Sequence, residues 1–202
     1  MNDSVFTAAA ISAYHATHML DQARIQALIR ARDWLTAAKL LAECGYTVTD
    51  TSIEHIIENE RIRTFNMFCE HCSDIELENI MREFYKFRTS IIGKNQTLND
   101  AELELKDIIT ANIHKIDHPL IKQYFKIYID AWNHGEKVPD ERLWRIAHEL
   151  RFDLNGTGVL FYWYAYKQAE FMAVRTILTG KRFNMEREQI MENLKRIYDR
   201  FK

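Results

Sequence analysis

The stretch "VRTILTGK", Val174–Lys181, has nearly the same pattern as "FRTSIIGK", Phe87–Lys94. In both copies an Arg-Thr pair is followed, after three residues, by Gly-Lys, and the copies are offset by 87 residues, counted from Lys94 to Lys181. Each copy closes an amphipathic segment, and an asparagine and an acid-rich segment follow it. The repeated unit is therefore a joint between two helices, and a repeat of this length indicates duplication of a structural unit.

Each residue type in this pattern suits a helix end. Glycine takes positive φ at low cost, and lysine complements the negative end of the helix dipole. Asparagine is a favourable first cap of the next helix. We therefore predict two helix ends, at Gly93-Lys94 and Gly180-Lys181, and two helix starts, at Asn99 and Asn184.

A phosphate-binding loop is the competing interpretation of a Gly-Lys pair. Such a loop follows a strand, opens a helix and continues with Ser or Thr after the lysine. Here each Gly-Lys closes a helix, where carbonyl groups repel phosphate, and Asn95 and Arg182 follow the two lysines. The pattern therefore favours a structural joint over a nucleotide site, and no cofactor is expected.

Composition excludes several other classes. The 202 residues are 47% hydrophobic and 28% charged, as in an ordinary globular protein, and only six Gly and two Pro interrupt helices. A net charge of -2 gives no drive toward nucleic acid. No apolar run approaches the roughly 18 residues of a membrane span, and no secretory signal is evident. Three cysteines indicate reduced thiols, so we expect a cytoplasmic protein.

Helical spacing of apolar residues covers nearly the whole chain. It predicts helices at about 4–31, 32–44, 50–72, 73–93, 99–115, 117–132, 139–152, 159–179 and 185–198. Gly45 suits the end of the second helix, Ser73 and Glu76 form a capping box, and Asp117 with Pro119 suits a helix start. "YTVTDT" is either a short strand or a turn. We predict a single all-α domain over 1–202, with repeated units at about 1–97 and 98–202.

Three stretches together resemble the C subunit of the rotary V/A-type ATPases, which is the d subunit of the eukaryotic V-ATPase. The first is "ARIQALIRARDWLTAAKLLAECGY" (23–46), an Ala-Arg-hydrophobic helix and a short helix that ends in an acidic residue and Gly-Tyr. The second is "EFYKFRTSIIGK" (83–94), and the third is "YWYAYKQAEFMAVRTILTGKRFNMEREQIMENL" (162–194). The third is similar to the family's Ala-Tyr-Lys-x-x-Glu helix, its Gly-Lys and its closing helix.

This resemblance implies a fold and a role. Family members have three related helical units about a pseudo-threefold axis, which form a funnel between the membrane ring and the central shaft. They transmit torque and carry out no covalent chemistry, so the implied partners are the other rotor subunits, and the protein is peripheral to the membrane. The chain departs from this pattern because it is about one repeat short. The interface or structural candidates are Arg24, Arg88, Gly93, Lys94, Glu170, Arg175, Gly180 and Lys181.

"FCEHC" (68–72) supports a different hypothesis, a small metal- or ligand-binding helical protein. Cys69, His71 and Cys72 offer three soft ligands for zinc. A structural zinc site needs four ligands, and no second Cys or His pair with zinc spacing follows. The alternative interpretation places both cysteines as partly buried packing residues at a helix end.

The segment "VLFYWYAYKQAEF" (159–171) is apolar on nearly every side, which favours a buried central helix over an interface. Glu170 near its end needs a basic partner if it is buried. Arg175 and Arg88 are the candidates, and a solvated carboxylate is the alternative.

Overall fold

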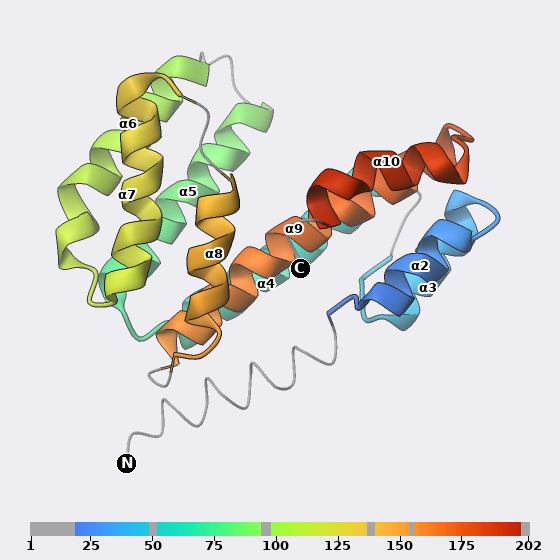
Figure 1. Cartoon of the computed structure of the whole chain (residues 1–202), viewed down its shortest axis with the longest axis horizontal. Coiled ribbons are helices and arrows are strands. Elements are labelled where there is room, and N and C mark those ends of the chain that lie inside the picture. The colour runs from blue at the N-terminus through green and yellow to red at the C-terminus, as the bar shows by residue number, and fades with distance from the viewer. Residues whose placement is uncertain (1–18, 49–51, 94–97, 137–139, 154–155, 199–202) are drawn as a thin grey trace. The chain divides into compact units, whose positions relative to one another are not determined.

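The structure is a computed structural model that describes residues 19–48, 52–93, 98–136, 140–153 and 156–198 (Figure 1). In these residues every regular element is helical, as predicted, and no strand occurs. No helix among them is long and apolar enough to cross a membrane. The elements are α2 (Gln22–Arg30), α3 (Trp34–Glu43), α4 (Ile53–His71), α5 (Ile75–Gly93), α6 (Leu98–Asn112), the 3-10 helix η1 (Ile113–Lys115), α7 (Pro119–His134), α8 (Asp140–Leu150), α9 (Thr157–Arg182) and α10 (Arg187–Tyr198).

The chain forms two compact units, and both boundaries between them fall inside helices, α4 and α9. We call described residues 19–48, 52–66 and 163–198 the terminal unit, and described residues 67–93, 98–136, 140–153 and 156–162 the central unit. Along the described residues, the central unit is thus inserted into the terminal unit. These units do not coincide with 1–97 and 98–202, whose relationship as repeats stays a prediction.

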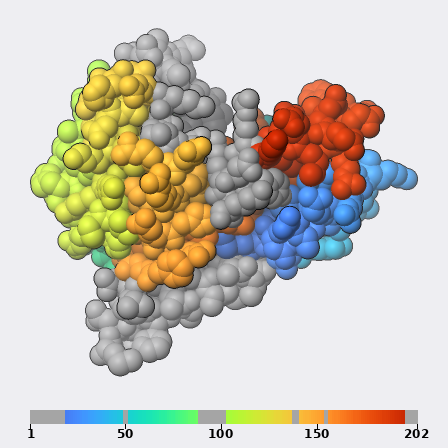
Figure 2. All heavy atoms as spheres, in the orientation of Figure 1, coloured from blue at the N-terminus to red at the C-terminus, as the bar shows by residue number. Residues whose placement is uncertain are grey.

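The terminal unit combines α2, α3 and α10 with the first part of α4 and most of α9. Its core contains aliphatic and aromatic side chains from all five helices, among them Leu28, Leu41, Ile57, Phe171, Ile177 and Ile190. The predicted stripe on α4 is confirmed, because Ile53, Ile56, Ile57, Glu60 and Phe65 are all buried. In the space-filling view α10 lies directly against α2, with red atoms beside blue ones (Figure 2).

The central unit is a bundle in which α5 packs against α6, α6 against α7 and α7 against α8 (Figure 1). Its core includes Phe68, Leu77, Ile80, Ile109, Phe125, Leu150 and Phe161. The Asp74 carboxylate accepts hydrogen bonds from the backbone N–H groups of Leu77 and Asp117, at 2.9 and 3.0 Å. A single side chain thereby caps α5 and holds the backbone at Asp117, just before α7 begins.

Three predicted caps of the central unit are wrong. Asp74 caps α5 in place of the Ser73 and Glu76 box, because its carboxylate reaches the Leu77 N–H. His118, not Asp117, is the N-cap residue of α7, although Pro119 does lie in the first turn as predicted. Asn99 lies inside α6, which already includes Leu98.

The predicted helix over 4–31 is confirmed at Gln22–Arg30 and is wrong at residues 19–21. Met19 and Leu20 are not helical, and the Asp21 carboxylate caps α2 by accepting from the Arg24 N–H at 2.7 Å. At this non-helical position the Leu20 N–H donates to Glu170 in place of a backbone carbonyl. Residues 4–18 of that prediction lie outside the described residues.

Gly45 ends α3 as predicted, with φ of 89°. Its N–H donates to the Ala42 carbonyl, and the Tyr46 N–H donates to the Leu41 carbonyl, at 3.0 and 3.1 Å. This pair of hydrogen bonds is the Schellman motif. It turns the chain back so that Tyr46 enters the core, where it is 4% exposed.

The prediction that Gly180 ends a helix is wrong. α9 continues through Lys181 and Arg182, and Asn184 takes the left-handed conformation, with φ of 53°, that a glycine was expected to supply. The Met185 N–H donates to the Gly180 carbonyl and the Asn184 N–H to the Lys181 carbonyl, at 2.8 and 3.2 Å. Asn184 therefore ends α9 and does not cap α10. Lys94, in the first copy, lies outside the described residues.

Gly180 instead allows α10 to approach α9 closely. A Cβ atom at this position would lie 2.6 Å from Cγ1 and 2.9 Å from Cδ1 of Ile190, which is fully buried. Because Cγ1 is not the flexible end of a side chain, the helices would have to separate. The Arg-Thr-x-x-x-Gly-Lys stretch thus marks a packing contact between helices in its second copy.

We expect Gly180→Ala to lower the free energy of unfolding by about 1–3 kcal/mol through overpacking, which the better helix propensity of alanine offsets only in part. Urea denaturation measures the change. In an Ile190→Ala background the clashing atoms are gone, so the same substitution should no longer destabilise the protein. An equal loss in both backgrounds would contradict the packing explanation.

Candidate functional site: a buried charged cluster

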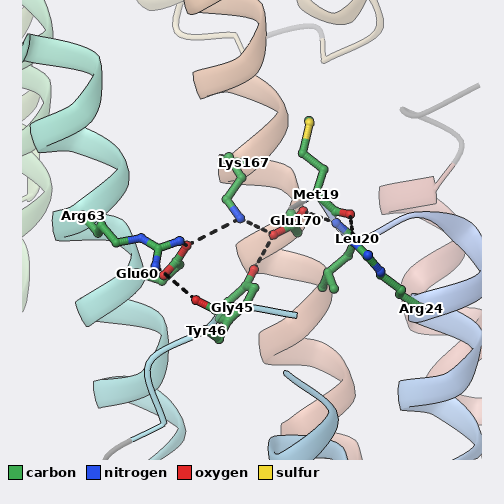
Figure 3. Close-up of polar contacts among 9 residues, drawn as sticks. All are labelled: Met19, Leu20, Arg24, Gly45, Tyr46, Glu60, Arg63, Lys167 and Glu170. Atoms are coloured by element: carbon green, nitrogen blue, oxygen red, sulfur yellow. Dashed lines mark hydrogen bonds and ion pairs between the residues drawn. The ribbon is translucent and has the colours of Figure 1, made fainter. Parts of the chain in front are cut away.

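The Glu170 carboxylate of α9 is the centre of the most extensive polar cluster in the described terminal unit (Figure 3). The side chain is 1% exposed. Oε2 accepts a hydrogen bond from the backbone N–H of Leu20 at 2.8 Å, and Oε1 accepts from the Tyr46 hydroxyl and from Lys167 Nζ, each at 2.5 Å. Three donors from three segments therefore satisfy one buried carboxylate.

Lys167 extends the cluster from α9 to α4. Its Nζ lies 3.7 Å from Oε1 of Glu60, and that same oxygen lies 2.9 Å from the guanidinium of Arg63. Arg63 in turn donates to the backbone carbonyl of Gly45 at 3.1 Å. The loop between α3 and α4 is thus attached twice, once through Tyr46 to α9 and once through Gly45 to α4. We call Tyr46, Glu60, Arg63, Lys167 and Glu170 the charged cluster.

Aromatic rings enclose the lysine. Lys167 Nζ lies 4.9 Å from the ring centroid of Tyr46 and 5.3 Å from that of Phe171, and these two rings meet edge to face at 6.4 Å. Cation–π attraction is strongest where water is excluded, and Lys167 is only 4% exposed. The rings therefore replace part of the solvation that the ammonium group loses on burial.

Local helix geometry places these groups. Lys167 and Glu170 are three residues apart on α9, as are Glu60 and Arg63 on α4, so each oppositely charged pair shares one helix face. The Schellman motif at Gly45 delivers Tyr46. At the start of α2, the Arg24 guanidinium donates to the Met19 carbonyl at 3.0 Å and helps to fix the backbone that presents the Leu20 N–H.

Burial changes the acidity of two members. It raises the pKa of Tyr46 well above the ordinary value of 10.0, and the negative charge and hydrogen bond of Glu170 raise it further, so Tyr46 remains a neutral donor. Burial also raises the pKa of Glu60, although Lys167 and Arg63 act in the opposite direction. The carboxylates of Glu60 and Glu170 face the cations of Arg63 and Lys167. Together with Leu20 and Tyr46, this arrangement connects α4 and α9 with the segment before α2 and the segment after α3.

Of the residues predicted as interface or structural candidates, Glu170 and Arg24 lie in or beside the cluster, and Gly180 lies between α9 and α10. The expected partner of Glu170 is wrong. Arg175 is exposed and pairs with Glu54 at 2.9 Å, whereas Glu170 binds Lys167. Lys181 lies in the last turn of α9, partly exposed. Gly93 is the last residue of α5, and the side chain of Arg88 lies outside what the structure describes.

Sequence reasoning missed Tyr46, Glu60, Arg63 and Lys167 as site residues. The three-residue spacing of Lys167 and Glu170 was a usable signal. No local signal linked Glu170 to Tyr46, which is 124 residues away.

The cysteine motif does not assemble a metal site. Within the described parts of the chain, no three His, Cys, Asp or Glu side chains converge as metal ligands, and this includes Cys69, His71 and Cys72. Burial raises the pKa of the Cys69 thiol and raises that of Cys72 to about 12. Cys72 Sγ also contacts the Asp74 carbonyl oxygen, at 3.3 Å. Both cysteines are half-buried at the end of α4, as the packing interpretation predicted.

Comparisons with protein-family models, with curated proteins and with solved structures find no match to the chain.

We expect Tyr46→Phe to lower the free energy of unfolding by about 1–3 kcal/mol, because it removes one donor to a buried carboxylate. Glu170→Gln should cost more, about 3–5 kcal/mol, since it leaves Lys167 without its closest partner and presents an amide N–H to donors. Urea denaturation of both single variants and the double variant checks this. Strict additivity of the two losses would contradict direct coupling between Tyr46 and Glu170.

We also expect the Cys72 thiol to react slowly. With a pKa of about 12, only about one molecule in ten thousand is thiolate at pH 8. In a Cys44→Ser, Cys69→Ser background, a disulfide reagent should label the folded chain far more slowly than the chain unfolded in urea. Equal rates would show that Cys72 is accessible and ionised.

Proposed function

We propose that the protein is a non-catalytic central-stalk component of a rotary V/A-type ATPase, which couples the rotor shaft to the ion-translocating membrane ring. Its partners in this proposal are the other rotor subunits, and it lies in the cytoplasm at the membrane surface. It acts by connecting two bodies mechanically, in a shortened version of the family's helical arrangement.

One observation carries the proposal. Two of the three stretches that carry the resemblance meet in the charged cluster: Tyr46 belongs to the Gly-Tyr of the first, and Lys167 and Glu170 belong to the Ala-Tyr-Lys-x-x-Glu of the third. These motif residues bind one another at 2.5 Å in a buried position. The motif therefore has a physical reason, which is to fix separate helices in one unit.

The chemistry of the cluster is consistent with a mechanical role. Its tyrosine, its lysine and one of its glutamates are engaged with each other, and burial holds Tyr46 in its neutral form. A torque-transmitting protein needs helices that do not slide. Buried pairs of charges resist sliding because separating them leaves an uncompensated charge in the core.

Affinity purification from the source cells tests the proposal. The full chain carrying a tag is purified in mild detergent, and its partners are identified by mass spectrometry. We expect the shaft and ring subunits of a rotary ATPase to co-purify in a fixed ratio, because a stalk component binds both.

The same tag on an unrelated helical protein of similar size serves as the control for nonspecific capture. The proposal would be contradicted if the tagged chain eluted without any ATPase subunit. It would also be contradicted if the control recovered the intact ATPase and the chain did not.

A further inference from the structure

Glu60 has one carboxylate oxygen without a hydrogen-bond partner in the described protein. Oε1 takes both contacts, with Arg63 at 2.9 Å and Lys167 at 3.7 Å, whereas Oε2 is buried and unpaired. One turn further along α4, the hydroxyl oxygen of Thr64 is also buried and unpaired, and that residue is 0% exposed. Two buried oxygens without partners, four residues apart on one helix, are costly unless a proton lets them bind each other.

We propose that Glu60 is a proton-binding site, which takes up a proton from solvent on Oε2 and directs the new O–H bond to the Thr64 hydroxyl oxygen. The only change is the formation of one O–H bond and the loss of one negative charge. This inference depends on the charged cluster alone and is independent of the rotor proposal.

Helix geometry supports the pairing of the two side chains. Residues 60 and 64 are four apart on α4, which puts them on the same face, and both are buried there. A carboxyl group turns about its last side-chain bond within a broad energy minimum. A small rotation about this bond moves both oxygens together, so we expect Oε2 to approach Thr64 with Oε1 still beside Arg63 and Lys167.

Glu170 cannot play this part. Both of its oxygens already accept hydrogen bonds, from Leu20, Tyr46 and Lys167, and a proton on either oxygen would face a donor. Within the cluster, the oxygen without a partner belongs to Glu60 and not to Glu170.

The groups that act on Glu60 include three charged side chains and one neutral tyrosine. Lys167 and Glu170 face it from α9, Tyr46 from the loop after α3, and Arg63 from its own helix. Burial raises the pKa of Glu60 above its ordinary 4.5, and the negative Glu170 raises it further, whereas the cations Lys167 and Arg63 lower it.

The folded protein thus binds this proton more tightly than the unfolded chain does. The contribution of Glu60 to stability is consequently largest below pH 4.5 and is lost as the pH rises through the raised pKa.

Two variants separate the glutamates. Glu60→Gln imitates the protonated form, because its amide can occupy the Oε2 position and donate to Thr64, whereas Glu170→Gln is a matched change in the same cluster. At neutral pH we expect Glu60→Gln to be at least as stable as the wild type, with the gap closing as the pH falls toward 4.5. Glu170→Gln should be less stable than the wild type at neutral pH, because it removes an acceptor of three hydrogen bonds. A Glu60→Gln variant that fails to fold, or that loses as much stability as Glu170→Gln at neutral pH, overturns the proposal.

Nuclear magnetic resonance gives a direct measurement on the wild-type chain. The Glu60 side-chain carboxyl carbon, assigned through its backbone, should titrate with a midpoint above 4.5. Thr64→Val removes the proposed acceptor at nearly constant volume, so it should shift that midpoint downward. A wild-type midpoint at or below the ordinary value overturns the proton site, and an unchanged midpoint in Thr64→Val overturns the assignment of Thr64 as acceptor.

Discussion

The terminal unit depends on one buried carboxylate. Glu170 accepts hydrogen bonds from the Leu20 N–H, the Tyr46 hydroxyl and the Lys167 ammonium group, and the first two donors belong to segments outside α9. The requirement is strict because an ionised carboxylate that is 1% exposed must have its partners in the protein. The non-helical backbone at Leu20, the tight turn at Gly45 and the position of Lys167 one turn before Glu170 all serve this requirement.

A hydrophobic core alone would hold these helices without specifying their register. Buried ion pairs add little net stability compared with well-packed apolar side chains, but a misplaced partner leaves a bare charge in the core. The cluster therefore selects one arrangement of α4 against α9. Between α9 and α10, the absence of a side chain at Gly180 allows Ile190 to pack closely against α9.

Local patterns predicted the helices well, because apolar spacing on α4 and the glycine after α3 have direct local consequences. The Gly-Lys repeat was misinterpreted at its second copy. Glycine is the commonest residue at a helix end, but Asn184 can also adopt positive φ, which freed Gly180 for packing. The contact between Tyr46 and Glu170 could not be predicted, because it joins residues 124 apart and depends on how the helices pack. The two nested units have the same origin, since they follow from contacts between distant segments.

The Leu20 amide offers the most direct measurement of the central claim. It lies before the first turn of α2, outside any helix, and its N–H donates only to the buried Glu170 carboxylate in the described structure. Native-state hydrogen exchange on the full chain should show this amide protected nearly as strongly as the core amides of α9, and Glu170→Gln should remove that protection while the amides of the central unit keep theirs. Rapid exchange at Leu20 in the wild-type protein would contradict the claim that Glu170 holds the terminal unit together.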